Sequence, residues 1–369
     1  MVYCCEELGK EFNMSLGQCN PQSKMMWHTD RIQQWLKTGN PDPLIFEIDP
    51  SNKCNQDCPW CSFSRLRSES KSMMCYETAR ALLYYLERLG VKAINWTGGG
   101  EPLMNPRIVE MIEYANMCHL DQGMFTNGLL LNARKANHII KNLDWIRFSV
   151  DGYDEKSYSR NHGTSEGAFN TVIDNIKYAC TINNRCTIGF GYIMTKDNYD
   201  GAGQITEIAK KCGVDYIQFK PVVHRKPKEQ LSPDIVDFMY ETAMRCKKYE
   251  TNNFKVMVTK YRFDDLKSPE TNYGRCYKKC LSHHFQGAVG ADGKVYLCDH
   301  HKGEKEYELG DLQINTMEEI WCSDKRKNVI EWLDTTDLSQ CMDCCRNHEL
   351  NKLLWHIANK DEGMHPNHI

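Results

Sequence analysis

The chain has 369 residues, of which 41% are hydrophobic and 26% are charged, and this composition is ordinary for a globular protein. Its formal net charge is -3, with acidic and basic residues spread along the chain, which argues against a dedicated binder of nucleic acids or membrane surfaces. No apolar run approaches the ~20 residues of a membrane-spanning helix, and the first residues lack a signal-peptide pattern, so we expect a cytoplasmic protein.

Strands and helices alternate through the first two thirds of the chain. Apolar, β-rich runs predict six strands, at 44–48, 92–96, 123–126, 145–150, 186–194 and 216–219. Helical periodicity falls between them, at 76–89, 107–118, 133–141, 166–181 and 202–212. This alternation predicts an α/β fold with a parallel sheet, in the form of a partial (β/α)6 barrel similar to a TIM barrel. In such barrels the chemistry lies at the carboxyl ends of the strands.

The pattern changes after the sixth strand. A helix is expected at 233–249 and a polar linker after it, and then two short strands joined through Asp292 and Gly293 predict a β-hairpin. We expect this hairpin and the helix at 317–321 to form a small iron–sulfur domain. The predicted parts are an N-terminal extension, the barrel, a linker, the small domain, and a C-terminal helix and tail, at 1–43, 44–240, 241–275, 276–350 and 351–369.

Nineteen cysteines are too many for such a chain unless some bind a metal, because the count is odd and no export signal accompanies it. The first strand leads into Cys54, Cys58 and Cys61, in the spacing C-x3-C-x2-C. Three thiolates on one loop can bind three irons of a [4Fe–4S] cube, and the fourth iron is then open to S-adenosylmethionine (SAM), which has an adjacent amine and carboxylate. A zinc loop is the alternative, but zinc sites usually pair C-x2-C with a second pair, and none lies nearby.

At these residues the chain resembles the radical SAM superfamily. The resemblance implies that Cys54, Cys58 and Cys61 bind the catalytic cluster. The string after the second strand resembles the glycine-rich SAM segment of that superfamily, and polar residues at later strand ends are further candidates for SAM contact. The residues assigned to SAM in this way are Trp60, Gly98, Gly99, Gly100, Glu101, Asn127, Ser149 and Asp151.

A second set of cysteines lies in the C-terminal domain. Its pattern resembles the twitch subgroup, the shortened relative of the SPASM domain, whereas spacing alone would also allow structural zinc. The resemblance implies one auxiliary [4Fe–4S] cluster, with the ligands Cys280, Cys298, Cys341 and Cys344. Cys345 is an alternative to Cys344, and Cys276 is an alternative to Cys280. The predicted cofactors are therefore SAM and two [4Fe–4S] clusters.

The resemblance implies reductive cleavage of SAM and removal of a hydrogen atom from an unactivated carbon, with a one-electron donor such as flavodoxin or ferredoxin as partner. We expect oxidation or epimerisation of a small polar substrate, such as a sugar, an aminocyclitol or a nucleotide-like molecule. Epimerisation needs a thiol as hydrogen donor, and the candidates are Cys246 and Cys276. The candidates for binding a phosphate or carboxylate of the substrate are Lys220, His224 and Arg225. The alternatives are radical modification of a ribosomally made peptide and a non-enzymatic iron–sulfur protein.

Overall fold

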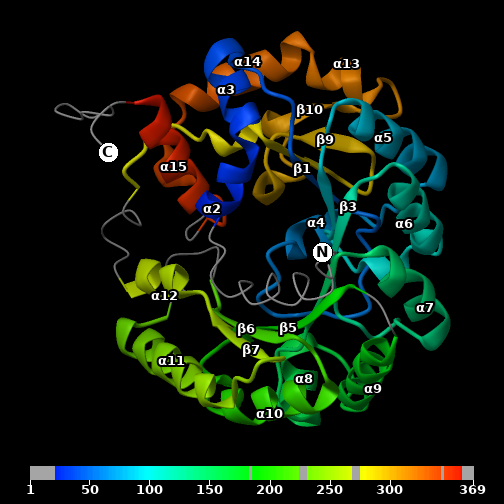
Figure 1. The fold of residues 1–369 in the computed structure, drawn as a ribbon, viewed down its shortest axis with the longest axis vertical. Coiled ribbons are helices and arrows are strands. Elements are labelled where there is room, and N and C mark those ends of the chain that lie inside the picture. Colours follow the sequence, from blue (N-terminus) through cyan, green and yellow to red (C-terminus); the bar gives the residue numbers. More distant parts are fainter. Residues whose placement is uncertain (1–20, 183–184, 224–230, 268–274, 342–344, 360–369) are drawn as a thin grey trace, which may run out of the picture.

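The computed structural model describes residues 21–182, 185–223, 231–267, 275–341 and 345–359. In this part of the chain ten strands form one sheet, in the order β10-β9-β8-β1-β2-β3-β4-β5-β6-β7. Figure 1 shows this sheet curved, with helices on its outer side. The described edge strands are β10 and β7, so the sheet is an open, partial barrel, and the predicted fold class is confirmed.

The six predicted strands are present and parallel to one another. They are β1 (Ile45–Ile48), β2 (Ala93–Trp96), β3 (Asp121–Thr126), β4 (Trp145–Ser149), β5 (Thr187–Met194) and β6 (Tyr216–Pro221). The predicted helices between them are also present, as α5 (Tyr76–Arg88), α6 (Ile108–Met117), α7 (Ala133–Asn142), α9 (Ala168–Thr181) and α10 (Ala202–Cys212). In α5 the buried residues recur at helical spacing and face the sheet, as Ala79, Leu82, Leu83 and Leu86.

The segment 241–275, expected to be a linker, continues the barrel instead. It contains the end of α11 (Pro233–Arg245), the strand β7 (Lys255–Val258), which pairs parallel with β6, and the helix α12 (Lys260–Lys267). The strand was missed because only four residues form it and polar residues surround it in the sequence, so it lacks a clear period of two. The helix α11 ends earlier than expected, at Arg245.

The predicted hairpin joins the sheet of the barrel. The strand β8 (Gln286–Val289) pairs parallel with β1, and β9 (Lys294–Tyr296) returns antiparallel to it. A third strand, β10 (Glu308–Asp311), and the helix α14 (Asp324–Thr335) were not predicted, whereas α13 (Met317–Trp321) was. Because β8 lies directly beside β1, the C-terminal part of the chain extends the same sheet as the barrel.

Residues before the barrel pack against the C-terminal helix. The helices α2 (Pro21–Met25) and α3 (Thr29–Thr38) form a second apolar core with α15 (His348–Ala358), apart from the large core of the barrel. Its buried members include Trp35, Leu44, Phe285 and Leu354. Among the described helices none combines the length and the apolar character needed to cross a membrane.

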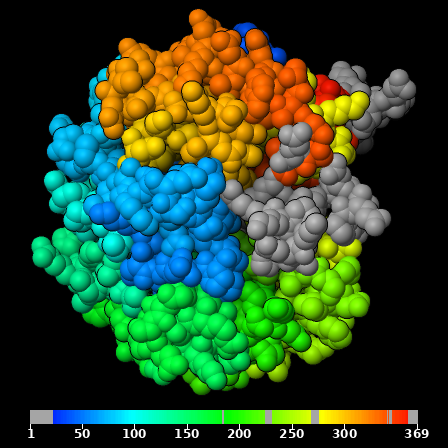
Figure 2. Space-filling model, turned by 180° about the vertical axis from the view of Figure 1, so that it is seen from behind, coloured from blue at the N-terminus to red at the C-terminus, as the bar shows by residue number. Residues whose placement is uncertain are grey.

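The loop after β1 lies between the middle of the barrel and the C-terminal part of the chain (Figure 2). It runs into the short helix α4 (Ser64–Glu69). Figure 2 shows this blue segment at the surface, between the orange C-terminal part and the green middle of the chain. The contacts on both sides of this loop define the candidate site.

Candidate functional site

The loop after β1 brings Cys54, Cys58 and Cys61 together at the carboxyl end of the strand. A turn from Cys61 N–H to Cys58 C=O, with a distance of 3.2 Å, forms its last part, and all three side chains are partly exposed. Burial raises the pKa of the Cys54 and Cys58 thiols, and nearby negative groups raise that of Cys58 further, among them Asp151 and the other two cysteines. Three thiols that repel one another when ionised need a shared positive charge, which a metal centre supplies.

The glycine segment after β2 lies against the start of this loop. Gly100 N–H donates to Ser51 C=O at 2.9 Å, and Glu101 N–H donates to Lys53 C=O at 2.8 Å. A Cβ on Gly100 would lie 2.1 Å from the Lys53 carbonyl oxygen, and one on Gly99 would meet a side chain of the same loop at 2.4 Å. Only glycine allows this approach, so the segment packs directly on the start of the cysteine loop, and its contact with SAM stays a prediction.

The carboxylate of Glu101 is bound by donors of the chain itself. Its Oε1 accepts from Thr126 Oγ1 at 2.6 Å and from Leu103 N–H at 3.0 Å, and its Oε2 accepts from Asn127 N–H at 2.8 Å. Burial raises the pKa of this carboxyl. Glu101 therefore ties the end of β2 to the end of β3, and Asn127 continues to the cysteine loop, where its Nδ2 donates to Asn55 Oδ1 at 2.8 Å.

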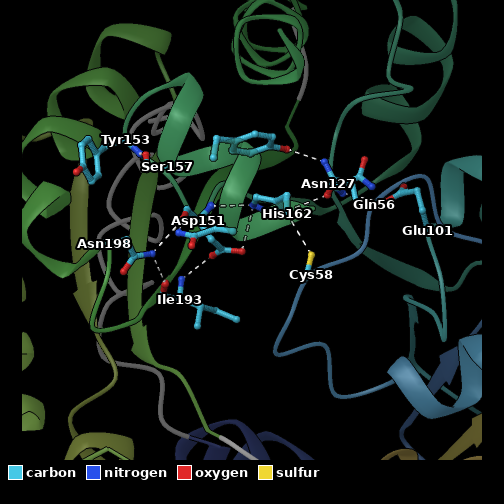
Figure 3. Close-up of polar contacts among 12 residues, drawn as sticks. Gln56, Cys58, Glu101, Asn127, Asp151, Tyr153, Ser157, His162, Ile193 and Asn198 are labelled. Atoms are coloured by element: carbon cyan, nitrogen blue, oxygen red, sulfur yellow. Dashed lines mark hydrogen bonds and ion pairs between the residues drawn. The ribbon is translucent and has the colours of Figure 1, made fainter. Parts of the chain in front are cut away.

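The strand ends β4 and β5 meet at Asp151, as Figure 3 shows. Its Oδ1 accepts from Ile193 N–H at 2.6 Å, and its own N–H donates to His162 Nε2 at 3.1 Å. Burial raises the pKa of Asp151 to about 7, although Arg147 and other groups oppose that shift. Ser149, the last residue of β4, is partly exposed, as is Trp60 on the cysteine loop. The predicted contacts of these side chains with SAM stay predictions.

The sequence interpretation missed His162 and Gln56, which lie beside Cys58 (Figure 3). The Nδ1 of His162 lies 2.9 Å from Gln56 Oε1 and 3.5 Å from Cys58 Sγ. Burial lowers the pKa of His162 to about 3, so its ring is neutral near pH 7. The sequence did contain a local signal for the short helix α8 (Glu155–His162). An Asp-x-x-Ser pattern at Asp154 marks its beginning, and the glycine directly after His162 marks its end.

Four of the C-terminal cysteines line one cavity under the hairpin. They are Cys280, Cys298, Cys341 and Cys345. Burial raises the pKa of Cys341 to about 11 and also raises that of Cys298 and Cys345. Cys344 lies outside the described residues. In the described chain no three His, Cys, Asp or Glu side chains are close enough to share a single ion, whereas a cube binds each thiolate at a separate iron.

A fully buried lysine joins this C-terminal part to the loop after β1. Lys302 Nζ lies 2.5 Å from Asp49 Oδ1 and 2.8 Å from Asp299 Oδ1. The other carboxylate oxygen of Asp49 accepts from Gly99 N–H at 2.9 Å. Asp299 follows Cys298 directly. The contacts from Asp299 through Lys302 and Asp49 therefore connect an auxiliary cysteine with the glycine segment.

Arg346 makes a second connection. It follows Cys345, and its two terminal nitrogens lie 3.1 Å from Glu47 Oε1 and 3.1 Å from Asp299 Oδ2. Glu47 belongs to β1, so this guanidinium joins the auxiliary cysteines to the first barrel strand. The buried Lys302 and the partly exposed Arg346 thus hold the segments next to Cys298 and Cys345 against β1 and the residue that follows it.

Lys220, predicted to bind substrate, lies at the end of β6 and is partly exposed. Among the described residues it makes no ion pair. Burial lowers its pKa well below the usual value, and the positive charges of Arg147, Arg262 and Arg346 lower it further. This is a cationic environment inside the barrel mouth. His224 and Arg225 lie outside the described residues.

Neither predicted hydrogen donor lies in the barrel mouth. Cys246 is buried in the turn between α11 and β7, where its Sγ donates to Thr242 C=O at 3.3 Å. A turn that leads from a helix into the next strand lies at the amino end of a βα barrel, opposite the cysteine loop, so the position of Cys246 does not favour the predicted donor role. Cys276 is exposed and does not line the cysteine cavity.

Comparison with known proteins gives two matches in chain order. Residues 48–209 match the model of the radical SAM superfamily, and residues 280–345 match that of the SPASM iron–sulfur cluster-binding domain. The protein is a radical SAM enzyme. Its radical SAM domain is followed by an iron–sulfur domain of the SPASM type, and its cofactors are SAM and iron–sulfur clusters.

Relatives of this radical SAM enzyme match most of its length. A cysteine-type anaerobic sulfatase-maturating enzyme of Clostridium novyi is 25% identical over 325 residues, which are 80% of this chain and 83% of the relative. The structure of SuiB of Streptococcus suis, bound to the precursor peptide SuiA, has a TM-score of 0.64 at 17% identity and covers 90% of this chain and 78% of SuiB. Native anSMEcpe with bound AdoMet has a TM-score of 0.60 at 19% identity and covers 84% of this chain and 89% of its own. At these identities the two structures show the fold alone.

The residues of this radical SAM enzyme fit its cofactors. In the cysteine loop, Asn52 Oδ1 and Asn55 Nδ2 are buried and have no hydrogen-bond partner among the described residues. A ligand with amine, carboxylate and hydroxyl groups, such as SAM, supplies partners for both atoms. Three thiols in the loop suit a cube with one open iron, and four thiols in the C-terminal cavity suit a closed cube.

Replacing Lys302 by methionine is expected to lower the free energy of unfolding by about 3–5 kcal/mol, because it leaves Asp49 buried without a cation and leaves Asp299 with Arg346 alone. Anaerobic urea unfolding of the reconstituted enzyme measures this. The control is Lys325→Met, which removes a half-exposed partner of Glu308 and should cost less than about 1 kcal/mol. Equal effects of the two changes would contradict the role given to Lys302.

Proposed function

We propose that this radical SAM enzyme removes a hydrogen atom from a peptide that carries an anionic group and completes the reaction as an oxidation. When bound, SAM and the cluster at Cys54, Cys58 and Cys61 supply the hydrogen-abstracting chemistry, and the auxiliary cluster supplies an electron acceptor. Loss of a hydrogen atom, followed by loss of a proton and an electron, amounts to a two-electron oxidation of the substrate.

The observation that carries this proposal is the position of the auxiliary cysteines. Arg346, next to Cys345, pairs with Glu47 in the first barrel strand, so the cysteine cavity lies close to that strand of the barrel. Four thiolates complete one cube and leave no iron for the substrate, as in the twitch arrangement, which suits an electron-transfer role. We infer that Cys345, rather than Cys344, is the fourth ligand, because Cys345 lines the cavity.

Oxidation is favoured over epimerisation by the positions of the thiols. Epimerisation needs a hydrogen donor opposite the abstracting radical, inside the barrel mouth. Cys246 lies at the other end of the barrel and Cys276 is exposed on the segment that leads to the auxiliary cysteines. An oxidation needs no such thiol.

The substrate class rests on two supports. The guanidinium groups of Arg147, Arg262 and Arg346, whose positive charges act on Lys220 and outweigh the negative charge of Asp151 there, suit a carboxylate or phosphate near the carboxyl end of β6. A peptide is favoured because the relatives include a sulfatase-maturating enzyme and SuiB, whose structure contains a precursor peptide. A phosphorylated sugar or nucleotide-like molecule is the second candidate, and the same cationic groups support it.

The reconstituted enzyme, incubated anaerobically with SAM and dithionite, should form 5′-deoxyadenosine faster when acidic peptides are added, and the peptide should lose two hydrogen atoms by mass spectrometry. Lys220→Gln should reduce this stimulation, whereas Lys211→Gln on the exposed face of α10 should not. Stimulation by nucleotides or sugar phosphates without any response to peptides would support the second candidate and contradict the first. Incorporation of solvent deuterium at carbon, with no change of oxidation state, would contradict oxidation.

A further inference from the structure

The imidazole of His162 lies against one of the cluster ligands. Its Nδ1 is 3.5 Å from Cys58 Sγ and 2.9 Å from Gln56 Oε1 (Figure 3). The ring is buried and stacks on Tyr158, with ring centroids 4.1 Å apart. The proposed function makes no use of this contact.

The backbone decides which ring nitrogen carries the hydrogen. Nε2 of His162 faces both the N–H of Asp151 at 3.1 Å and the carboxylate Oδ2 of Asp151 at 3.4 Å. The shorter contact is the donation from the backbone N–H, so we assign Nε2 as the bare nitrogen and Nδ1 as the N–H. Gln56 Nε2 donates to Tyr158 Oη at 2.9 Å, and Gln56 Oε1 faces Nδ1 of His162. The Nδ1–H group of His162 therefore faces two acceptors, Gln56 Oε1 and Cys58 Sγ.

The main chain holds this ring beside the loop. The helix α8 begins at a capping box of Asp154 and Ser157 and ends at Gly163, whose φ of 56° is left-handed. A Cβ on Gly163 would lie 2.3 Å from the Asp57 carbonyl oxygen, and Asp57 N–H donates to His162 C=O at 2.9 Å. The carboxyl end of α8 is thus docked on the cysteine loop, one residue from Cys58.

We propose that His162 is a positioning residue that donates a hydrogen bond from Nδ1 to the Cys58 thiolate of the catalytic cluster and raises the reduction potential of that cluster. A thiolate is a stronger acceptor than a thiol, so ligation to iron draws the hydrogen from Gln56 Oε1 toward Cys58 Sγ. Reduction adds negative charge to the ligand sulfurs, so this hydrogen bond stabilises the reduced cluster more than the oxidised one. The inference rests on the cluster assignment at Cys54, Cys58 and Cys61 and adds a control of how readily that cluster accepts its electron.

The test is an anaerobic redox titration followed by EPR, without SAM, on the reconstituted enzyme and its variants. The signal that changes when SAM is added afterwards identifies the catalytic cluster. His162→Phe keeps a flat ring but removes the N–H, and its midpoint potential should become more negative. His162→Asn places an amide N–H near the position of Nδ1, and its potential should return toward that of the unchanged enzyme. Phe169→Leu, which changes the packing around Tyr158 but removes no hydrogen bond of His162 or Gln56, is the packing control and should leave the potential unchanged.

An unchanged potential in His162→Phe, or equal shifts in the Phe and Asn variants, overturns the inference and leaves His162 a packing role. If His162→Phe does not fold, the unchanged enzyme decides by ENDOR in H2O and D2O. An exchangeable proton coupled to the reduced catalytic cluster, and lost in D2O, supports the hydrogen bond, and its absence overturns it. Iron analysis keeps the proposals apart, because a chain that holds no cluster at Cys54, Cys58 and Cys61 contradicts the proposed function itself.

Discussion

Replacing Cys54, Cys58 and Cys61 together by alanine is expected to abolish formation of 5′-deoxyadenosine and to lower the iron content from about eight to about four atoms per chain. The reason is that these three thiols, close together at the end of β1, are the only protein ligands proposed for the catalytic cube. Anaerobic reconstitution, iron analysis and chromatography of the SAM products measure both quantities.

The matched control is the double change Cys276→Ala and Cys322→Ala, since both side chains are exposed and neither lines the cysteine cavity. This variant should keep about eight irons and full SAM cleavage. SAM cleavage that survives the triple change would show that the first site is assigned wrongly. Loss of iron in the control would reopen Cys276 as an auxiliary ligand.

The second large effect is expected at the auxiliary site. Cys345→Ala should lose about four irons and the oxidised product, because a cube with a missing thiolate is no longer closed and the electron acceptor is lost. SAM cleavage should continue without product, since Cys54, Cys58 and Cys61 are untouched. The measurements are iron per chain, 5′-deoxyadenosine and product, taken from the same incubation.

Cys344→Ala is the control for this experiment, because Cys345 and not Cys344 is assigned to the cavity. It should keep about eight irons and form product at the rate of the unchanged enzyme. The reverse result, with iron lost from Cys344→Ala and kept in Cys345→Ala, would restore the ligand set that the resemblance implied.

Much of the barrel could be predicted from local pattern. The strands β1 to β6 and the helices between them carry apolar residues at clear periods, because each packs one face against the same core. The C-x3-C-x2-C loop and the glycine segment were equally visible, since both are short and contiguous. The short helix α8 and the strand β7 were missed, because few residues form each of them and contacts across the barrel stabilise them.

In the candidate site, too, residues in a local pattern were predicted and residues brought together by the fold were not. Cys58 was assigned from its spacing, whereas His162 is 104 positions away and no local pattern relates the two. The pairs Lys302 with Asp49 and Arg346 with Glu47 are as distant in sequence, and their meaning depends on β8 lying beside β1. The position of Cys246 at the amino end of the barrel was equally hidden, because it follows from the connection between α11 and β7.

The amino-acid sequence by itself determined the class of chemistry: cysteines with three and two residues between them on one loop, followed by a glycine segment, are local features that need no folded partner to be recognised. The tertiary structure alone decided which groups surround those cysteines. A buried imidazole lies beside Cys58 and a buried lysine pairs with Asp49, because the fold packs the end of α8 and the segment after β9 against the end of β1 and its loop, whatever the separation of the residues along the chain.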